Sequence, residues 1–253
     1  MFTRFPPRCS EKGRIHDALC IIRWYPYVVG ADVLSIVSHQ TIIAGRCMNE
    51  RKWGNLLVSI TLLLTSQDNG LYFYPSPCCS SCVNFCRKLL QAPVEALCKT
   101  MIVENTMVDK QSISDPENPL KNRCFAVLLQ YCTKLDTERL AKQLRNMALE
   151  RYPAEEAPSF KLKMAEAEDS YKLTGYEFNA ITPFGTTNEL PLILSRNIVR
   201  QQSEGTFRYV WLGGGDPDLK LRLFVKQVQT KYKPAVFVVE CTEARNEYMD
   251  EQE

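Results

Sequence analysis

The sequence predicts an α/β or α+β domain built on a mixed β-sheet, and three observations carry this prediction. Short apolar, β-prone runs such as 100–104 and 124–131 are typical of buried strands. Asp136 precedes an amphipathic pattern over 137–150, which places Leu140 and the apolar residues after it on one helix face. Strands and helices follow one another without strict β–α–β alternation, which favours a mixed sheet.

From residue 91 onward the elements can be predicted in order. A short helix is expected at 93–98, with a proline near its first turn, and a polar loop with two prolines is expected at 109–121. Gly175 is expected to end a second helix in the left-handed conformation. The other expected elements are that second helix at 164–173, strands at 190–194, 207–212 and 219–223, a helical piece at 224–232 and a last buried strand at 235–241.

Residues 1–90 differ from the rest and are predicted to form a cysteine-rich, poorly ordered N-terminal extension. Seven of the eleven cysteines lie before residue 90, and acidic residues are few there. The apolar runs 28–36 and 56–64 can be strands or buried helical pieces, and the sequence does not separate the two. The main domain is predicted over 91–243, followed by an acidic tail over 244–253.

Charge and hydropathy restrict the partners and the compartment. The formal net charge is +2, and residues 91–253 carry 21 Lys/Arg and 24 Asp/Glu, so a nucleic-acid ligand would need a local basic face. The first residues lack the apolar core of a cleavable signal peptide, and 56–64 is too short to span a bilayer. We therefore expect a cytoplasmic protein with free thiols and no membrane association.

Metal and nucleophile chemistry have little support in the sequence. Cys79 and Cys82 have a ligand-like spacing, but a four-thiolate zinc site needs a second, separated pair, and no such pair follows. His16 and His39 are the only histidines, which excludes a Ser–His or Cys–His pair within 91–243. A structural protein whose cysteine-rich extension binds metal is therefore the least supported interpretation.

Lys99 is the most informative residue of the domain. It lies in 97–104, where a helix-like start passes into the β-prone run. Its position fits a solvated strand end as well as a desolvated amine that orients a substrate. The three glycines at 213–215 follow a predicted strand and allow close backbone approach to a ligand, or form a plain hairpin turn. Successive amides in such a turn can receive an anion or a developing oxyanion.

Four features occur in a fixed order: Lys99 at the start of a strand, a Thr-Gly…Pro-x-Gly loop over 174–185, a Leu-Pro strand at 190–194, and a glycine turn after Trp211. This ordered set resembles the YbaK/prolyl-tRNA-synthetase-associated domain family over residues 91–243. Members of that family are aminoacyl-tRNA editing modules. The resemblance implies a YbaK-like fold, with a mixed, strongly curved sheet surrounded by helices.

The resemblance also implies an activity: trans-editing deacylation of a mischarged aminoacyl-tRNA, in particular a proline-acceptor tRNA carrying alanine or cysteine. It implies prolyl-tRNA synthetase as a partner, no cofactor and no catalytic metal, because the protein mainly positions an activated ester. Lys99 is the implied catalytic residue. The implied substrate-binding residues are Asn179, Ala180, Thr182, Pro183, Gly185, Gly213, Gly214 and Gly215.

Two positions depart from the pattern of the family. Asn179 stands where glycine is common, although asparagine tolerates left-handed backbone. Ser195 stands where an aspartate is common after the Leu-Pro strand. These departures leave open a catalytically idle module of the same fold that binds tRNA or a synthetase without turnover.

Overall fold

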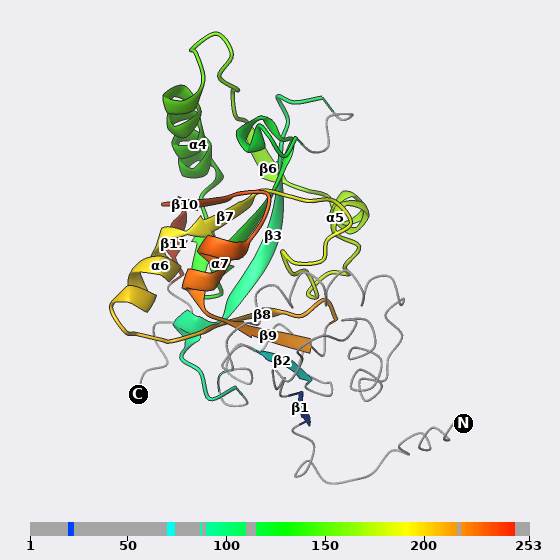
Figure 1. The fold of residues 1–253 in the computed structure, drawn as a ribbon, viewed down its shortest axis with the longest axis vertical. Coiled ribbons are helices and arrows are strands. Elements are labelled where there is room, and N and C mark those ends of the chain that lie inside the picture. Colours follow the sequence, from blue (N-terminus) through cyan, green and yellow to red (C-terminus); the bar gives the residue numbers. More distant parts are fainter. Residues whose placement is uncertain are drawn as a thin grey trace, which may run out of the picture.

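The computed structural model describes residues 87, 90–109, 115–216 and 219–245, and the backbone of two short strands at 20–22 and 70–73. These residues form the strands and the four helices α4 to α7 that Figure 1 shows, with short 3₁₀ helices at Val94–Ala96 and Pro119–Lys121. In chain order the elements are β1 (Cys20–Ile22), β2 (Gly70–Phe73), β3 (Cys98–Asn105), β4 (Cys124–Gln130), β5 (Thr133–Leu135), α4 (Thr137–Arg151), β6 (Leu162–Met164), α5 (Ala167–Thr174), β7 (Leu192–Ser195), α6 (Arg196–Ser203), β8 (Val210–Gly213), β9 (Leu219–Leu223), α7 (Val225–Lys231), β10 (Val236–Val239) and β11 (Thr242–Ala244).

A five-stranded mixed sheet forms the centre of the domain, in the order β10-β7-β4-β3-β6. β4, β7 and β10 run parallel, whereas β3 is antiparallel to both β4 and β6. Every residue of β4 is buried, which explains why this strand is an almost continuous apolar run in the sequence. The predicted mixed α/β architecture is therefore confirmed.

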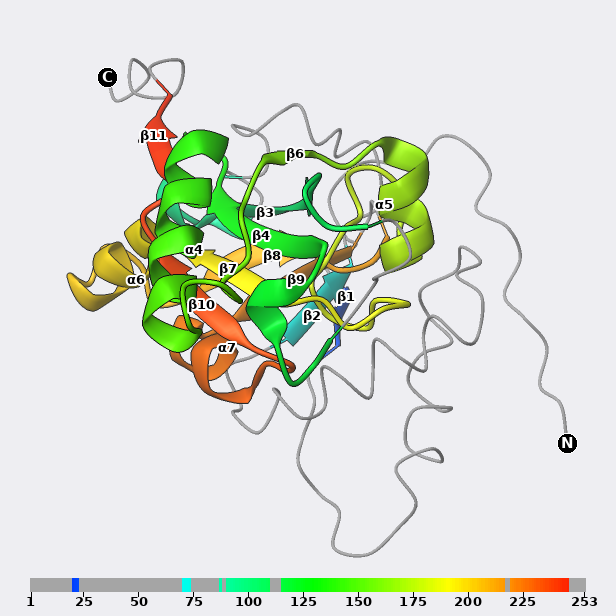
Figure 2. The same ribbon diagram turned by 90° about the horizontal axis from the view of Figure 1, so that it is seen from above.

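Helix α4 covers one face of this sheet (Figure 2). Leu140 and Leu144 lie on one side of the helix and belong to a core with Phe125 of β4, which we call the α4 core. The side chain of Asp136 accepts a hydrogen bond from the backbone N–H of Arg139 at 2.8 Å, so it caps the helix as predicted. Such a cap stabilises a helix by about 1 kcal/mol.

The other face of the mixed sheet contributes to a second core, which we call the hairpin core. A second sheet, in the order β1-β2-β9-β8, has only antiparallel pairings among its described strands. Leu128 of β4 belongs to the same core as Leu212 of β8 and Leu221 of β9. A single parallel bridge between Leu97 and Trp211 joins the start of β3 to β8. The two sheets therefore meet beside Lys99.

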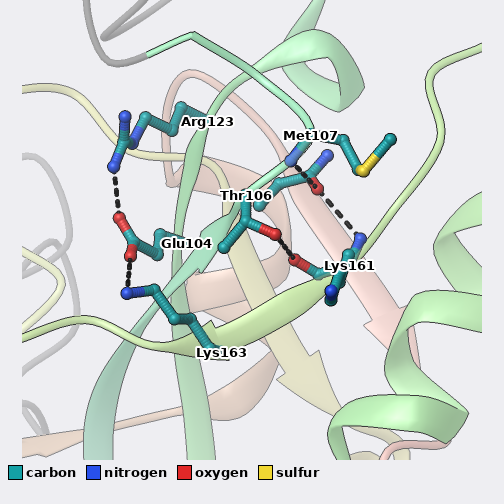
Figure 3. Close-up of polar contacts among 7 residues, drawn as sticks. Glu104, Thr106, Met107, Arg123, Lys161 and Lys163 are labelled. Carbon is teal, nitrogen blue, oxygen red and sulfur yellow. Dashed lines mark hydrogen bonds and ion pairs between the residues drawn. The ribbon is translucent and has the colours of Figure 1, made fainter.

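The carboxyl end of β3 is fixed by a buried ion-pair network (Figure 3). Glu104, whose side chain is 5% exposed, accepts a hydrogen bond from Arg123 at 2.5 Å and forms an ion pair with Lys163 at 2.7 Å. Burial alone raises the pKa of Glu104, but the hydrogen bonds from Lys163 and Arg123 outweigh it and lower the pKa. Beside this network the Thr106 hydroxyl donates to the carbonyl of Lys161 at 3.1 Å. This end of β3 has a structural role.

Some elements differ from the sequence prediction. The helix expected at 164–173 starts later, because Leu162–Met164 pairs with β3 as β6 and α5 begins at Ala167. Gly175 ends α5 at φ 74°, as predicted. The helix expected at 93–98 is a 3₁₀ turn at Val94–Ala96. Helix α6 was not predicted, because Ile198 is its one buried residue and gives little apolar periodicity.

The predicted extension and tail are only partly within the described residues. The runs 28–36 and 56–64 lie outside them, whereas β1 and β2 extend the second sheet next to β9. At the other end, β11 reaches Ala244 and pairs with β5. The proposed boundaries at 90 and 243 therefore remain predictions. Within the described part, no helix combines the length and apolarity needed to cross a bilayer, and the four cysteines there are buried free thiols.

Candidate active site

Lys99 is the second residue of β3 and is half-buried at the edge of the mixed sheet. Its Nζ lies 5.7 Å from the centroid of the Tyr131 ring, a cation–π distance. Burial is the main cause that lowers the pKa of Lys99, and the positive charge of Arg245 lowers it further. A partly desolvated ammonium in this position is suited to orient a polar group of a ligand.

Lys99 and Ser195 lie on the same face of the sheet. Lys99 is paired with Leu129, and directly opposed residues project to one face. The β4–β7 register, continued by one residue beyond the pair Leu128–Leu194, brings Leu129 opposite Ser195. Lys99 and Ser195 are therefore two strand spacings apart, about 10 Å between Cα atoms. The structure thus places the predicted catalytic lysine on the same face as Ser195, one of the two positions at which the sequence departs from the pattern of the family.

The Ser195 side chain is held by neutral partners. It is fully buried, and its Oγ lies 3.2 Å from Oγ1 of Thr242 in β11. Asn197 Nδ2 donates to the same Thr242 oxygen at 3.1 Å. Thr242 follows the last predicted strand, and no pattern in the sequence indicates that it contacts Ser195. At position 195, where the family commonly has an aspartate, this chain has a buried hydroxyl that belongs to a cluster of neutral groups.

The loop expected to contact substrate is braced by two buried tyrosines. Tyr176 donates from its hydroxyl to the carbonyls of Phe184 and Gly185, at 2.8 and 2.9 Å. The Tyr232 hydroxyl donates to the carbonyl of Leu190 at 2.7 Å and lies 3.2 Å from that of Pro183, and its ring packs edge-on against the Phe184 ring. Burial raises the pKa of both tyrosines, so they remain neutral hydrogen-bond donors. Neither tyrosine was predicted from the sequence, in which nothing links residue 232 to this loop.

The backbone of this loop takes the turn that the sequence suggested. Asn179 has φ 68° and Gly185 has φ 65°, both in the left-handed region. Asn179 is exposed, whereas Ala180, Thr182 and Pro183 are buried. Asparagine therefore adopts a conformation that glycine would allow at the same position. The buried residues hold the loop in place, and the exposed ones remain accessible to a ligand.

The loop packs directly against the glycine turn. A Cβ added at Gly213 would lie 2.8 Å from the carbonyl oxygen of Ile181, so only glycine fits there without a shift. Gly215 donates its N–H to the carbonyl of Ala180, and Gly214 donates to the carbonyl of Leu219, both at 3.0 Å. These two amides are therefore not available to an oxyanion. The turn positions the loop, and the expected role of the three glycines in binding a substrate remains a prediction.

Replacing Gly213 by alanine is expected to displace the loop. The new Cβ would meet backbone atoms, which cannot rotate away, so we expect a loss of about 1–3 kcal/mol in the free energy of unfolding. Urea unfolding measures this loss. Gly205→Ala is the control, because a Cβ there meets nothing within 4 Å although its φ of 82° strains any side chain. If Gly213→Ala unfolds at the same urea concentration as wild type, the contact between loop and turn does not restrict this position.

The loop and Lys99 are positioned by packing on opposite faces of the mixed sheet. Ile181 and Phe184 pack in the hairpin core, with Cys98 from β3, whereas Leu129, the partner of Lys99, belongs to the α4 core. The described contacts bring the predicted loop and turn together, and they join Lys99 to neither. What connects them is the Leu97–Trp211 bridge, two residues before Lys99 on one strand and two before Gly213 on the other.

No group of three or more His, Cys, Asp or Glu side chains among the described residues is placed to hold a metal ion. The buried thiols are not poised as nucleophiles either. Burial raises the pKa of Cys124 and of Cys132 to about 11, and that of Cys241 to about 12. The chemistry available at this edge is therefore positioning by a lysine, hydroxyl groups and backbone.

The chain is similar to known proteins in its sequence and in its fold. The family model of the aminoacyl-tRNA editing domain matches residues 81–231, and no curated protein matches significantly. One solved structure, a candidate trans-editing enzyme for prolyl tRNA synthetase, has a TM-score of 0.52 at 14% identity over 76% of this chain and 98% of that chain. A second, from work on epitope backbone grafting by computational design on scaffold proteins, has a TM-score of 0.53 at 14% identity over 78% of this chain and 100% of that chain. At this identity both are evidence for the fold alone.

Proposed function

Because the chain belongs to the aminoacyl-tRNA editing domain family, we propose that it is a trans-editing deacylase that hydrolyses the ester of a mischarged tRNA in the cytoplasm. In this reaction water adds to the ester carbonyl and the bond to the ribose oxygen breaks. The products are a free amino acid and a tRNA with its terminal hydroxyl restored. An aminoacyl ester is already activated, so the protein needs chiefly to position it and to stabilise charge.

The observation that carries the proposal is the half-buried Lys99, whose pKa is lowered at the edge where the two sheets meet. An ammonium there can donate a charge-assisted hydrogen bond to the ester carbonyl or to the terminal ribose. Its charge is less screened than at a solvated strand end, so it stabilises developing negative charge more strongly. The vicinal ribose hydroxyl can carry the proton, which removes the need for a histidine.

The loop and the glycine turn supply the wall of the proposed pocket. Asn179 offers an exposed amide side chain, and Gly185 is partly exposed in the same loop. Ala180, Thr182 and Pro183 support the loop from within. Gly215 holds the loop through its N–H bond to the carbonyl of Ala180, Gly213 leaves room for the carbonyl of Ile181, and Gly214 closes the turn through its bond to Leu219. In this arrangement the loop limits the size of the accepted amino acid, and Lys99 determines the position of the reacting ester.

The proposed substrate is a proline-acceptor tRNA carrying alanine or cysteine, with prolyl-tRNA synthetase as the partner that produces it. The structural neighbour described as a candidate trans-editing enzyme for prolyl tRNA synthetase supports the choice of this synthetase, and the choice of alanine or cysteine rests on the family resemblance. The test is a panel in which the full chain is incubated with this tRNA charged with alanine, cysteine or proline. Release of alanine or cysteine, with proline retained, is the expected result. Equal release of all three would reject the proposed specificity.

Ser195 favours a second candidate, a binding module of the same fold without turnover. Its hydroxyl is bound to Thr242 and carries no charge toward Lys99. In that case the protein would bind the same tRNA and leave the ester intact. Measuring binding and hydrolysis on the same charged tRNA separates the two functions.

A further inference from the structure

Positive charge is concentrated in one part of the domain. Residues 196–233 carry eight Lys/Arg and three Asp/Glu, whereas the remainder of 91–253 carries 13 and 21. This basic segment comprises α6, β8, β9 and α7, which lie together in Figure 1. The domain as a whole is slightly acidic, so this segment is the part in which the sequence concentrates the positive charge that a nucleic-acid ligand requires.

Within this segment, arginine side chains lie at cation–π distance from aromatic rings. Arg222 Cζ lies 4.6 Å from the Tyr209 ring centroid and 5.6 Å from that of Trp211. Arg208 Cζ lies 5.4 Å from the Tyr209 and Phe224 ring centroids, and these two rings are 4.6 Å apart. We call these five residues the stacked face. They present flat rings and guanidinium planes together with two positive charges.

The stacked face begins at the loop of the proposed pocket. Trp211 is paired with Arg222, and Gly213 with Lys220, so these residues lie on one side of the β8–β9 hairpin. On that side Gly213 is covered by the carbonyl of Ile181. From Gly213 back to Tyr209 the strand spans four residues, about 13 Å. The surface therefore runs outward from the loop.

The outer part of this face is accessible. Trp211 and Lys220 are each only 8% exposed, next to the loop. Farther out, Tyr209, Arg222 and Phe224 are half-buried, and Arg208 is exposed. A ligand that reaches the loop along this face would therefore contact the rings of Tyr209 and Phe224 and the two guanidinium groups.

We propose that the stacked face binds the single-stranded 3′ end of the aminoacyl-tRNA. This inference rests on the proposed function and extends it to the part of the substrate outside the pocket. Unstacked bases pack on aromatic rings and guanidinium planes, and the phosphates between them pair with arginine. The stacked face offers rings for bases and arginines for phosphates, and it leads to the loop. It therefore fits a short single strand, whose terminal ester would then reach the pocket.

The test measures binding of the full chain to an uncharged, fluorescently labelled proline tRNA by anisotropy. Tyr209→Ala is expected to weaken the Kd about 5- to 100-fold, whereas Tyr209→Phe, which keeps the ring, stays near wild type. Arg208→Ala is expected to reduce the slope of log Kd against log salt by about 0.7. Lys142→Ala removes an exposed charge from α4 on the other side of the mixed sheet and is the matched control.

The same tRNA lacking its unpaired 3′ nucleotides completes the test. Wild type should bind it as weakly as Tyr209→Ala binds the intact tRNA, and Tyr209→Ala should not distinguish the two. Equal affinity of wild type for both RNAs, or equal losses in Arg208→Ala and Lys142→Ala, would overturn the inference. The RNA in this test carries no amino acid, so binding is measured independently of hydrolysis. If charged tRNA is not hydrolysed but binding behaves as expected, the deacylase is rejected and this inference stands. If charged tRNA is hydrolysed but the Tyr209 and Arg208 variants bind like wild type, the stacked face alone is rejected.

Discussion

Lys99→Ala is expected to slow hydrolysis of the mischarged tRNA about 30- to 1000-fold while the protein stays folded. Removing one positioned, charge-assisted hydrogen bond in a partly dry site raises the barrier by about 2–4 kcal/mol. The side chain lies at the half-buried start of β3, so its truncation leaves no large core cavity. Single-turnover deacylation with the full chain in excess measures the effect.

Two further variants define what the lysine does. Lys99→Arg should also be slow, because a planar guanidinium does not replace a compact ammonium. Lys134→Ala, which removes an exposed lysine from β5 at the same edge, should keep the wild-type rate. Full activity in Lys99→Ala would show that Lys99 has no catalytic role, even if the chain is a deacylase.

Glu104→Ala is expected to give the largest loss of stability, about 2–3 kcal/mol in the free energy of unfolding. The substitution leaves the Arg123 guanidinium, whose side chain is 11% exposed, without its ion-pair partner in the interior. The figure is below that of a fully buried pair because Lys163 is 52% exposed and solvent screens its share. Urea unfolding of the two proteins at neutral pH measures the difference.

The matched control for this prediction is Glu168→Ala. Glu168 also pairs with a lysine, Lys172, at 2.7 Å, but both side chains are exposed and we expect little change. The pH dependence gives a second check. The folded pKa of Glu104 is depressed, so its stabilisation is complete above the unfolded value of about 4.3 and is lost as pH falls through the folded value. A stability difference that persists unchanged well below pH 4 would contradict the assigned role.

The strands, the main helix and the family could be predicted from the sequence because each depends on local patterns. The apolar run of β4 and the Asp136 cap of α4 are encoded by neighbouring residues. The family was predicted from the order of Lys99, the loop and the glycine turn, and the match over 81–231 confirms it. Periodicity failed where an element is short or exposed, as in β6 and α6.

The candidate site was less predictable because its contacts join distant parts of the chain. The Tyr232 hydroxyl reaches Pro183 across 49 residues, and the Ser195 hydroxyl reaches Thr242 across 47. In the glycine turn, the Gly215 N–H donates to the carbonyl of Ala180 in the distant loop, a contact that the sequence does not show. Register also cannot be seen in one strand, so the alignment of Lys99 with Ser195 became visible only through β4.

The most direct test of the proposed editing function is the hydrolysis of alanine-charged proline tRNA by the full wild-type chain, in buffer containing a metal chelator. The proposal predicts release of alanine well above the spontaneous rate, at the same rate with and without the chelator. Release at the spontaneous rate, with tRNA binding intact, would contradict the deacylase and favour the binding module.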